Sequence, residues 1–359
     1  MSRGRPDRIP TMPQICHPHA VAMLYDDYRE GMAEVVENPG KALDLVLEAA
    51  RRYDVDGLRL FTPTESFKVV DDGEVMLALD PETGERVGRV DVLGGGAVVA
   101  DKPSHAAETA DDVNAIPVPG CADLLETMPF VTLAQAVEKA HDEGFFVASS
   151  PGPFTVNFLA LQRGREQALV DLIANAQLAS RIMEVGLEIA IERAQALVAC
   201  DIDALYIGDP SAGASVISPR HFEEFCLPRF RAFCDELHKR SVLIYIHVCG
   251  NAQPLLEMLA DTGADCVEPL DPLGNVSVAD AKRRIGARVS LMGGVNTLTL
   301  LHGSPESVYQ EALVCCQAGG ADGGYILAAG DMVPDFTPQE NVLALVQAAK
   351  DFRTCSRSG

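Results

Sequence analysis

The chain has 359 residues, of which 47% are hydrophobic, and a formal net charge of -23 at pH 7. This length allows one large α/β barrel or two ordinary domains, so length alone does not decide the number of domains. The acidic balance argues against nucleic acid and anionic membranes as partners, since binding to either requires clustered Lys and Arg. We therefore expect the partner to be a small molecule or another protein.

The sequence carries no sign of export or membrane insertion. No apolar stretch that could form the core of a signal peptide follows the basic residues at 3, 5 and 8, and no apolar run is long enough to span a bilayer. The ten cysteines are scattered without the regular spacing of a disulfide scaffold. We expect a cytoplasmic protein with reduced thiols.

Short apolar runs rich in β-branched residues alternate with longer stretches of helical spacing. In chain order, strands are predicted at 9–15, 55–61, 145–149, 204–208, 242–248, 266–270, 289–292 and 325–328. Helices are predicted at 39–53, 132–143, 165–199, 219–240, 254–262, 278–285, 305–318 and 338–350. This alternation indicates repeated βα units and a mostly parallel sheet.

One segment interrupts the alternation. Two strand-like runs, 74–79 and 86–93, flank the turn-rich sequence 80–84, which predicts a β-hairpin insertion near residues 70–100. The stretch 101–123, rich in Ala, Asp and Pro, is expected to return to the main fold as an extended linker or excursion.

The polar residues at strand ends distinguish a closed barrel from an open, doubly wound sheet. In a barrel the carboxyl ends of the strands converge on one mouth, whereas an open sheet spreads them along a line. No Gly-x-Gly-x-x-Gly turn is present, which argues against a dinucleotide-binding sheet. The residues at or just beyond predicted strand ends are Asp209, His247, Cys249, Glu268, Asp271, Asn296 and Asp331. We predict a single (β/α)8 TIM barrel domain over 1–359, in which 71–122 form the insertion and linker.

The strand at 242–248 ends in a His-x-Cys sequence. His247 and Cys249 are two residues apart, so their side chains would project from the same face of the strand toward the mouth. Zinc binds both side chains, and a catalytic zinc usually has three protein ligands and one open position. Asp331, which follows the last predicted strand, is the candidate third ligand, and Glu268 is the alternative. The two residues could also be merely packed and hydrogen-bonded at a strand end.

Several short motifs together resemble the uroporphyrinogen decarboxylase superfamily, from about Arg5 to Lys350. The motifs are Arg5-Pro6-Asp7-Arg8-Ile9-Pro10, Gly152-Pro153-Phe154-Thr155, His247-Val248-Cys249-Gly250-Asn251, Leu291-Met292-Gly293-Gly294-Val295-Asn296 and Gly324-Tyr325-Ile326-Leu327. The resemblance implies a (β/α)8 barrel with its site at the carboxyl-terminal mouth.

The branch of the superfamily is indicated by the segment 13–19. True decarboxylases carry an Arg-Gln-Ala-Gly-Arg segment there, whose cations hold the carboxylates of the substrate, but 13–19 of this chain contain no arginine. The other branch comprises the corrinoid-dependent methyltransferases, and many of its members bind zinc through a His-x-Cys pair and a later Cys. His247 and Cys249 match that pair, and Asp331 stands at the later position.

The resemblance implies a zinc-dependent methyltransferase that moves a methyl group between a small methylated substrate and a separate corrinoid (cobalamin) protein. The substrate would be a thiol or a methoxy compound. An oxygen-containing ligand set favours the methoxy compound and therefore O-demethylation. The alternatives are a metal-free enzyme, such as a decarboxylase-like enzyme acting on another substrate, and a non-catalytic barrel that serves in a methyl-transfer complex.

Other polar residues at the mouth are candidates for substrate contacts. Asp209 and Glu268 are predicted to orient the substrate or to handle protons, because carboxylates beside a divalent cation stay ionised. Asp209 could instead cap the turn that follows it. His17, His19 and Asn296 are predicted to bind the substrate, although the two histidines could also lie in a solvated, capped turn.

Overall fold

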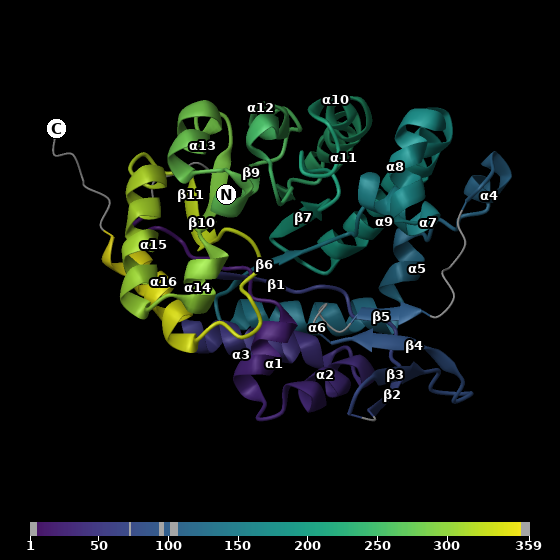
Figure 1. The fold of residues 1–359 in the computed structure, drawn as a ribbon, viewed down its shortest axis with the longest axis horizontal. Coiled ribbons are helices and arrows are strands. Elements are labelled where there is room, and N and C mark those ends of the chain that lie inside the picture. Colours follow the sequence, from purple (N-terminus) through teal and green to yellow (C-terminus); the bar gives the residue numbers. More distant parts are fainter. Residues whose placement is uncertain (1–5, 72, 93–96, 101–106, 353–359) are drawn as a thin grey trace.

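The computed structural model describes residues 6–71, 73–92, 97–100 and 107–352. Its main sheet has seven parallel strands in the order β1-β6-β7-β8-β9-β10-β11. Their bounds are β1 (Gly57–Arg59), β6 (Phe146–Ser149), β7 (Ala204–Gly208), β8 (Leu243–His247), β9 (Cys266–Leu270), β10 (Ser290–Val295) and β11 (Tyr325–Ala329). The sheet is curled, and its strands follow one another in chain order, as expected for successive βα units (Figure 1).

The expected first strand at 9–15 is an extended segment that forms only isolated bridges among the described residues. Thr11 pairs with Leu327 and Gln14 pairs with Met332, on the β11 side. On the other side, the backbone N–H of Gly57 donates to the carbonyl oxygen of Thr11 over 3.3 Å. The segment therefore lies between the two edge strands of the curled sheet and bonds to both.

Helices cover the outer face of this sheet (Figure 1). The first part of the chain forms α1 (His17–Leu24), α2 (Tyr28–Glu37), α3 (Lys41–Tyr53), α6 (Met128–Asp142), α7 (Val156–Arg163), α8 (Arg165–Ala174) and α9 (Ala176–Ala199). The second part forms α10 (Pro219–His221), the π-helical turn η1 (Phe222–Cys226), α11 (Leu227–His238), α12 (Leu256–Ala260), α13 (Val278–Ile285), α14 (Thr297–His302), α15 (Pro305–Gly319) and α16 (Gln339–Asp351). The predicted helix at 165–199 is interrupted at Asn175, and the predicted helix at 219–240 contains η1.

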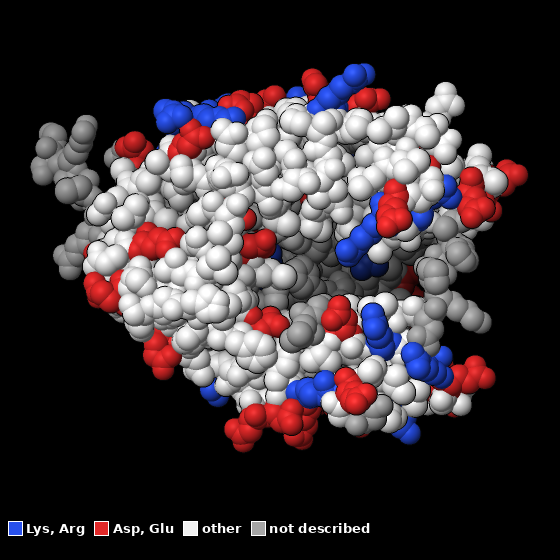
Figure 2. Space-filling view, in the orientation of Figure 1, with Lys and Arg blue, Asp and Glu red and all other residues white. Residues whose placement is uncertain are grey.

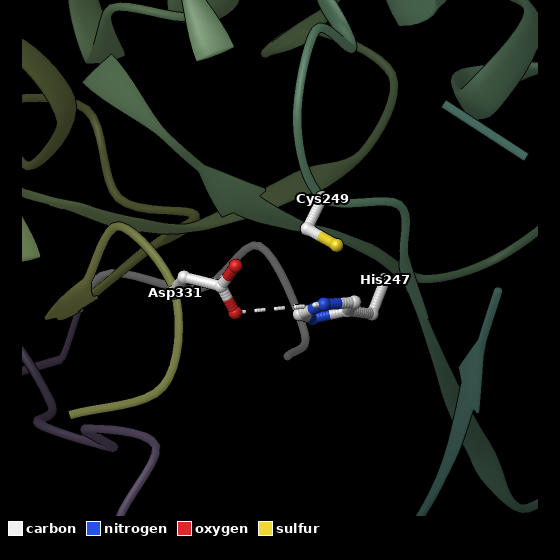
Figure 3. Close-up of side chains that lie close together, drawn as sticks. All are labelled: His247, Cys249 and Asp331. Atoms are coloured by element: carbon white, nitrogen blue, oxygen red, sulfur yellow. Dashed lines mark ion pairs between the residues drawn. The ribbon is translucent and has the colours of Figure 1, made fainter. Parts of the chain in front are cut away.

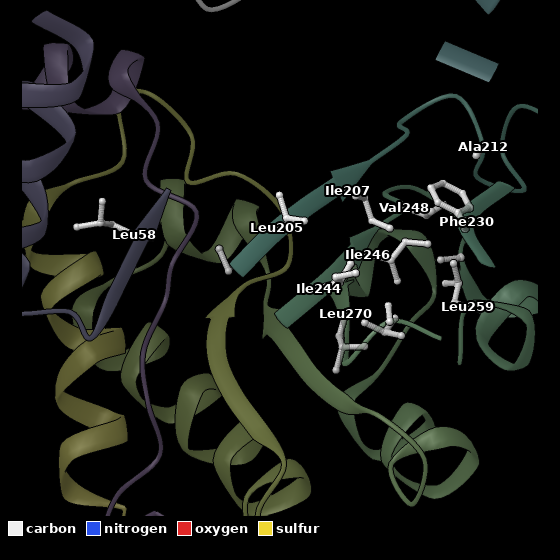
Figure 4. Close-up of a cluster of buried hydrophobic side chains, with 14 of the residues drawn as sticks. Leu58, Leu205, Ile207, Ala212, Phe230, Ile244, Ile246, Val248, Leu259 and Leu270 are labelled. Carbon is white, nitrogen blue, oxygen red and sulfur yellow. The ribbon is translucent and has the colours of Figure 1, made fainter. Parts of the chain in front are cut away.

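Side chains on each strand alternate between two apolar regions. On β8, Ile244 and Ile246 belong to the large cluster between sheet and helices, together with Phe230 and Leu259 (Figure 4). Tyr245, between them, belongs to a smaller cluster with Met12, Ala148, Ala204, Cys266, Met292, Ile326 and Ala328. That second cluster fills the inside of the curled sheet. The next residue of β8 on the inner face is His247, so the alternation delivers the imidazole to the end of this interior.

The predicted hairpin is part of a larger insertion. Strands β2 (Lys68–Asp71), β3 (Met76–Leu79), β4 (Arg86–Asp91) and β5 (Ala97–Ala100) form a four-stranded antiparallel sheet. Its inner face packs on α2, where Val36 forms one buried cluster with Met76, Ala78 and Val90. Two additional strands thus pair with the expected hairpin, because its edges and apolar face need partners.

The expected extended linker at 101–123 is wrong in part. Residues 101–106 lie outside the described residues, but α4 (Ala110–Asn114) and α5 (Cys121–Leu125) are short helices. A capping box at Thr109 and Asp112 stabilises the first of them. Val113 is the buried side chain of this helix, so the sequence lacks the apolar periodicity that would have predicted it. Among the described residues no helix is both long and apolar enough to cross a bilayer. The single-domain assignment and the cytoplasmic location stay predictions.

Candidate metal centre

Three side chains from two strand ends converge at the mouth of the curled sheet (Figure 3). His247 ends β8, Cys249 follows two residues later, and Asp331 follows β11. One ligand atom from each lies within 4.8 Å of the other two, and His247 Nε2 is 3.8 Å from an Asp331 carboxylate oxygen. His247 is buried, whereas Cys249 and Asp331 are half-buried. The arrangement is a buried imidazole facing a thiol and a carboxyl group that remain accessible.

The turn after β8 depends on two glycines. Gly250 has a φ of 72°, which turns the chain immediately after Cys249. A Cβ on Gly213 would lie 2.5 Å from the carbonyl oxygen of Cys249, so the loop after β7 can approach only as glycine. These two positions hold the Cys249 backbone beside His247.

A buried ion pair lies on the Nδ1 side of His247. Glu268, on β9, accepts from His247 Nδ1 over 2.6 Å and from the Arg59 guanidinium over 2.6 Å. Arg59 also donates to the side-chain oxygen of Gln14 over 3.0 Å. Because a carboxylate faces Nδ1, that nitrogen keeps its proton, and Nε2 is the ring nitrogen directed toward Cys249 and Asp331 that can bind a metal once it is deprotonated. Glu268 is therefore placed behind the imidazole, and Asp331 completes the set of three.

Aromatic rings surround the cation of this pair. The Arg59 guanidinium carbon lies 4.4 Å from the centre of the Tyr206 ring and 5.4 Å from that of Tyr245. Tyr206 also packs edge-on against His247, with ring centres 5.4 Å apart. Burial alone would raise the pKa of Glu268, but the charges of Arg59 and His247 outweigh it and lower that pKa. The carboxylate is thus held ionised where water is excluded.

A metal ion bound through Nε2 should bind more tightly as pH rises. Burial lowers the pKa of His247, but the Glu268 carboxylate and a hydrogen bond with Cys249 outweigh it and raise that pKa to about 10. In the metal-free protein, this shift stabilises the fold below the ordinary imidazole pKa of 6.5, and the stabilisation is lost as pH rises toward 10.

Since the metal must displace the Nε2 proton, we expect its apparent affinity to rise about tenfold per pH unit for that proton. Zinc titrations against a chelating indicator, at several values between about pH 6 and pH 9, would check this. An affinity that does not change with pH would contradict the pairing of His247 with Glu268.

A family model described as uroporphyrinogen decarboxylase (URO-D) matches residues 93–352 of the chain. The chain belongs to the uroporphyrinogen decarboxylase family. It is 29% identical over 238 residues to the methylcobamide:CoM methyltransferase MtaA of Methanosarcina barkeri, covering 64% of this chain and 66% of the relative. The chain thus spans just under two thirds of the length of that relative.

Other relatives cover more of the chain. A uroporphyrinogen decarboxylase of Cupriavidus necator is 26% identical over 340 residues, covering 90% of this chain and 86% of the relative. The solved structure of a methyltransferase from Methanosarcina mazei superposes with a TM-score of 0.71 at 21% identity, covering 97% of this chain and 95% of the other. At this identity the superposition supports the uroporphyrinogen decarboxylase fold, and it leaves the reaction to be argued from the site.

In this member of the uroporphyrinogen decarboxylase family, the Asp209 carboxylate is engaged within the loops at the mouth. It accepts hydrogen bonds from the Thr155 hydroxyl, from the backbone N–H of Asn157 over 2.9 Å and from that of Ser211 over 2.8 Å. Burial raises the pKa of Asp209, although these hydrogen bonds act against the rise. Its geometry fits the capping alternative, and a role with substrate stays a prediction.

The remaining predicted substrate residues have structural partners. His19 is buried; its Nδ1 lies 3.0 Å from the carbonyl oxygen of Asp335, and its Nε2 lies 2.9 Å from the Tyr53 hydroxyl. Asn296 caps α14 by accepting from the backbone N–H of Leu298 over 2.8 Å. His17 begins α1 and lines a cavity beside the mouth. The structure brings His247, Cys249 and Asp331 together with Glu268 behind them, whereas Asp209, His19 and Asn296 are held within loops and helix ends.

Sequence reasoning missed the buried cation. Arg59 is 4% exposed and lies inside the apolar run predicted as a strand at 55–61, where an arginine is unusual unless it is paired. An arginine inside a predicted buried strand was therefore the signal that could have indicated a buried ion pair. Cys16 was also passed over: its thiol lies 3.5 Å from the sulfur of Met332, and burial raises its pKa to about 11 despite the opposing effect of Arg59.

Proposed function

We propose that this protein is a zinc-dependent methyltransferase that moves a methyl group between a small methylated substrate and a corrinoid protein. The observation that carries the proposal is the convergence of His247, Cys249 and Asp331 at the mouth. The similarity to a methylcobamide:CoM methyltransferase supports the same class of reaction. Methylcobamide is a corrinoid, so the partner would carry that cofactor.

The ligand set fits a zinc ion. In tetrahedral coordination, zinc ligands stand roughly 3.4 Å apart, because each bond is about 2.0 to 2.3 Å long. The 3.8 Å separation of His247 Nε2 and the Asp331 oxygen is close to that value, and Cys249 lies within 4.8 Å of both. Three protein ligands leave one position for substrate, as in catalytic rather than structural zinc sites. The 35% exposure of Asp331 leaves that side accessible.

The chain's own residues would prepare this site. When bound, zinc would supply a Lewis acid that polarises the oxygen or sulfur bearing the methyl group. Glu268 holds the Nδ1 proton of His247 and so fixes the ring in the orientation that directs Nε2 to the site. Arg59 keeps Glu268 ionised. The carboxylate of Asp331 replaces a thiolate of the usual set, which makes the ligands harder and favours a methoxy oxygen over a thiol.

The rim of the mouth supports contact with a large partner. Six large apolar side chains that follow strand ends are more than a third exposed: Phe61, Val216, Leu273, Leu298, Met332 and Phe336. They come from the segments after β1, β7, β9, β10 and β11. A cluster of exposed apolar side chains around a site marks a contact surface. A corrinoid protein that presents its cofactor to the site would cover this rim.

Methyl transfer with free cobalamins tests the proposal. We expect the zinc-loaded protein to methylate cob(I)alamin from a methoxy compound, or to demethylate methylcobalamin with a thiol, and we expect exhaustive chelation to abolish the reaction. The cobalt oxidation state can be followed by its visible absorption. Absence of both reactions, or undiminished turnover without metal, would refute the proposal and favour the metal-free, decarboxylase-like alternative.

Acidic substitutions on the rim should weaken the approach of the corrinoid. For a Leu273→Glu/Leu298→Glu variant we expect KM for methylcobalamin to rise about tenfold or more, since apolar contact area is replaced by hydrated charge. Zinc content should not change. Val314→Glu, at an equally exposed site on α15 away from the strand ends, is the matched control. An equal effect of both variants would argue against the rim as the contact surface.

A further inference from the structure

Two tyrosine hydroxyls on the inner face of the curled sheet have no hydrogen-bond partner among the described residues. The chain has seven tyrosines. The hydroxyls that bond to a carboxylate, an imidazole or a backbone carbonyl are those of Tyr25, Tyr28, Tyr53, Tyr309 and Tyr325. The other two tyrosines are Tyr206 on β7 and Tyr245 on β8. Tyr245 is fully buried inside the sheet, whereas Tyr206 is half-buried, so its hydroxyl can meet a molecule that enters the mouth.

The Tyr206 hydroxyl lies at the level of His247. Tyr206 and Gly208 are two residues apart on β7 and face the same side, and Gly208 pairs with His247 in the parallel register. A Cβ on Gly208 would lie 2.6 Å from the Tyr206 hydroxyl oxygen, so this oxygen occupies the side-chain space that the glycine leaves empty. Since neighbouring strands are about 4.8 Å apart, the hydroxyl lies beside the imidazole at the carboxyl end of the sheet.

Three contacts fix the Tyr206 ring. It covers the Arg59 guanidinium at 4.4 Å, and it packs edge-on against His247 at 5.4 Å and against Phe61 at 5.9 Å between ring centres. Phe61 lines a cavity of about 570 Å³ between the N-terminal helices and the four-stranded sheet, and Figure 2 shows the molecule hollowed in its middle, between this part and the rest of the barrel. The ring thus stands between the cavity and the metal ligands, and its hydroxyl is directed along β7 to the mouth.

The hydroxyl is a hydrogen-bond donor on a side of the site that supplies no ligand. His247 and Cys249 come from β8 and Asp331 follows β11, so the side of β7 is left for a molecule at the open position. A phenol has a pKa of about 10 and is therefore protonated at neutral pH; oxygen accepts its hydrogen bond well, and sulfur accepts it weakly. A fixed donor also stabilises the negative charge that develops on an oxygen when its methyl group leaves.

We propose that the Tyr206 hydroxyl donates a hydrogen bond to the methyl-bearing oxygen of the substrate at the metal centre, and that it thereby selects oxygen over sulfur. This inference rests on the proposed function and adds a residue that contacts the substrate. In the transfer, the bond between methyl carbon and oxygen breaks and both its electrons stay on oxygen. The cobalt(I) of the reduced corrinoid supplies the electron pair for the new cobalt–carbon bond, and Tyr206 keeps its proton.

Binding of an ether and a sulfide to the zinc-loaded full chain, without corrinoid, tests the contact independently of turnover. The probes are 1-methoxypropane and 1-(methylthio)propane, which differ only in the atom that bears the methyl group, and ligand-detected NMR measures their affinities. Tyr206→Phe removes the hydroxyl but keeps the ring over Arg59, so zinc content should not change. We expect the dissociation constant of the ether to rise about three- to tenfold, the effect of losing one hydrogen bond, and that of the sulfide to change by less than about twofold.

Two further variants make the test specific. Tyr245→Phe removes a hydroxyl from the neighbouring strand that is buried in the interior cluster below the mouth, so it is the matched control and should change neither dissociation constant. Gly208→Ala introduces a Cβ at the position that the Tyr206 hydroxyl occupies, so it should displace the hydroxyl and weaken binding of the ether more than binding of the sulfide.

The outcomes separate this inference from the proposed function. An ether-specific loss of affinity in Tyr206→Phe, in a protein that transfers no methyl group, would uphold the contact at the metal centre and refute the transferase. Zinc-dependent methyl transfer with unchanged ether affinity in Tyr206→Phe, or with equal losses for ether and sulfide, would overturn the role of Tyr206 alone. An equal loss in Tyr245→Phe would also overturn it, because the effect would then come from the packing around Arg59.

Discussion

His247→Ala and Cys249→Ala variants should each lose the zinc that the wild-type protein is expected to retain at about one ion per chain. Either substitution leaves two ligands from a set of three, and neither removes a large apolar side chain from the core. We expect zinc content below about a tenth of the wild-type value after dialysis against a weak chelator. Loss of a residue that only hydrogen-bonds to a ligand typically lowers metal affinity about 10- to 100-fold, and loss of a ligand itself should lower it more. Elemental analysis of the purified proteins measures this directly.

Two further variants make this test specific. Cys16→Ala removes a neighbouring thiol whose raised pKa keeps it protonated, so it should retain zinc and serves as the matched control. Asp331→Cys replaces the carboxylate by a thiol, so that both other ligands beside His247 would be thiolates, and this variant should also retain zinc. Full zinc content in both alanine variants, or the same loss in Cys16→Ala, would show that the metal binds elsewhere.

An Arg59→Met variant should be destabilised by about 3 to 5 kcal/mol, the cost of leaving one member of a buried ion pair without its partner. Arg59 is 4% exposed and Glu268 is fully buried, with 2.6 Å between their paired atoms. Methionine keeps much of the side-chain volume against Tyr206 and Tyr245, so the decrease in the free energy of unfolding would come mainly from the removed charge. Urea denaturation followed by circular dichroism gives the free energy of unfolding.

The controls separate this buried pair from ordinary surface pairs. Arg29→Met removes a partner of Asp71 that is bound over 2.8 Å but is about one third exposed, so we expect a much smaller cost than for Arg59→Met, because solvent screens an exposed pair. Arg59→Met/Glu268→Gln removes both charges and should recover part of the lost stability. Since the pKa of Glu268 is lowered, the stabilising pair is present at neutral pH and is lost as pH falls below the ordinary carboxyl pKa of 4.5. Equal costs for Arg59→Met and Arg29→Met would contradict the burial of this pair.

The grouping of the three candidate metal ligands could be predicted because the signals that indicate it are local. His247 and Cys249 are two residues apart at a strand end, and Asp331 directly follows the last strand, so the known convergence of strand ends in a barrel was enough to group them. The expected roles of Glu268 and Asp209 were less specific. Both follow or end a strand, but sequence position does not say whether a carboxylate faces substrate, a histidine or a backbone N–H.

The four-stranded sheet shows a different limit. The turn at 80–84 predicted its central hairpin, yet the pairing of β2 and β5 with it depends on contacts between runs that are each only four residues long. Such short strands gain their stability from neighbours rather than from their own composition. The cavity between this sheet and α2 follows from that packing, and for this reason no pattern in the sequence indicated it.

By itself, the sequence determined the alternation of strands and helices, the side of the sheet on which the polar residues gather, and the three side chains able to hold a metal. These properties depend on periodicity and on the residue types at strand ends, which are local. Only the tertiary structure decided that Arg59 and Glu268 pair behind His247, that His19 and Asn296 hold loops and helix ends, and that an apolar cavity forms between α2 and the four-stranded sheet. Those features join residues as far apart as 316 positions in the chain, and which buried charges meet is set by packing.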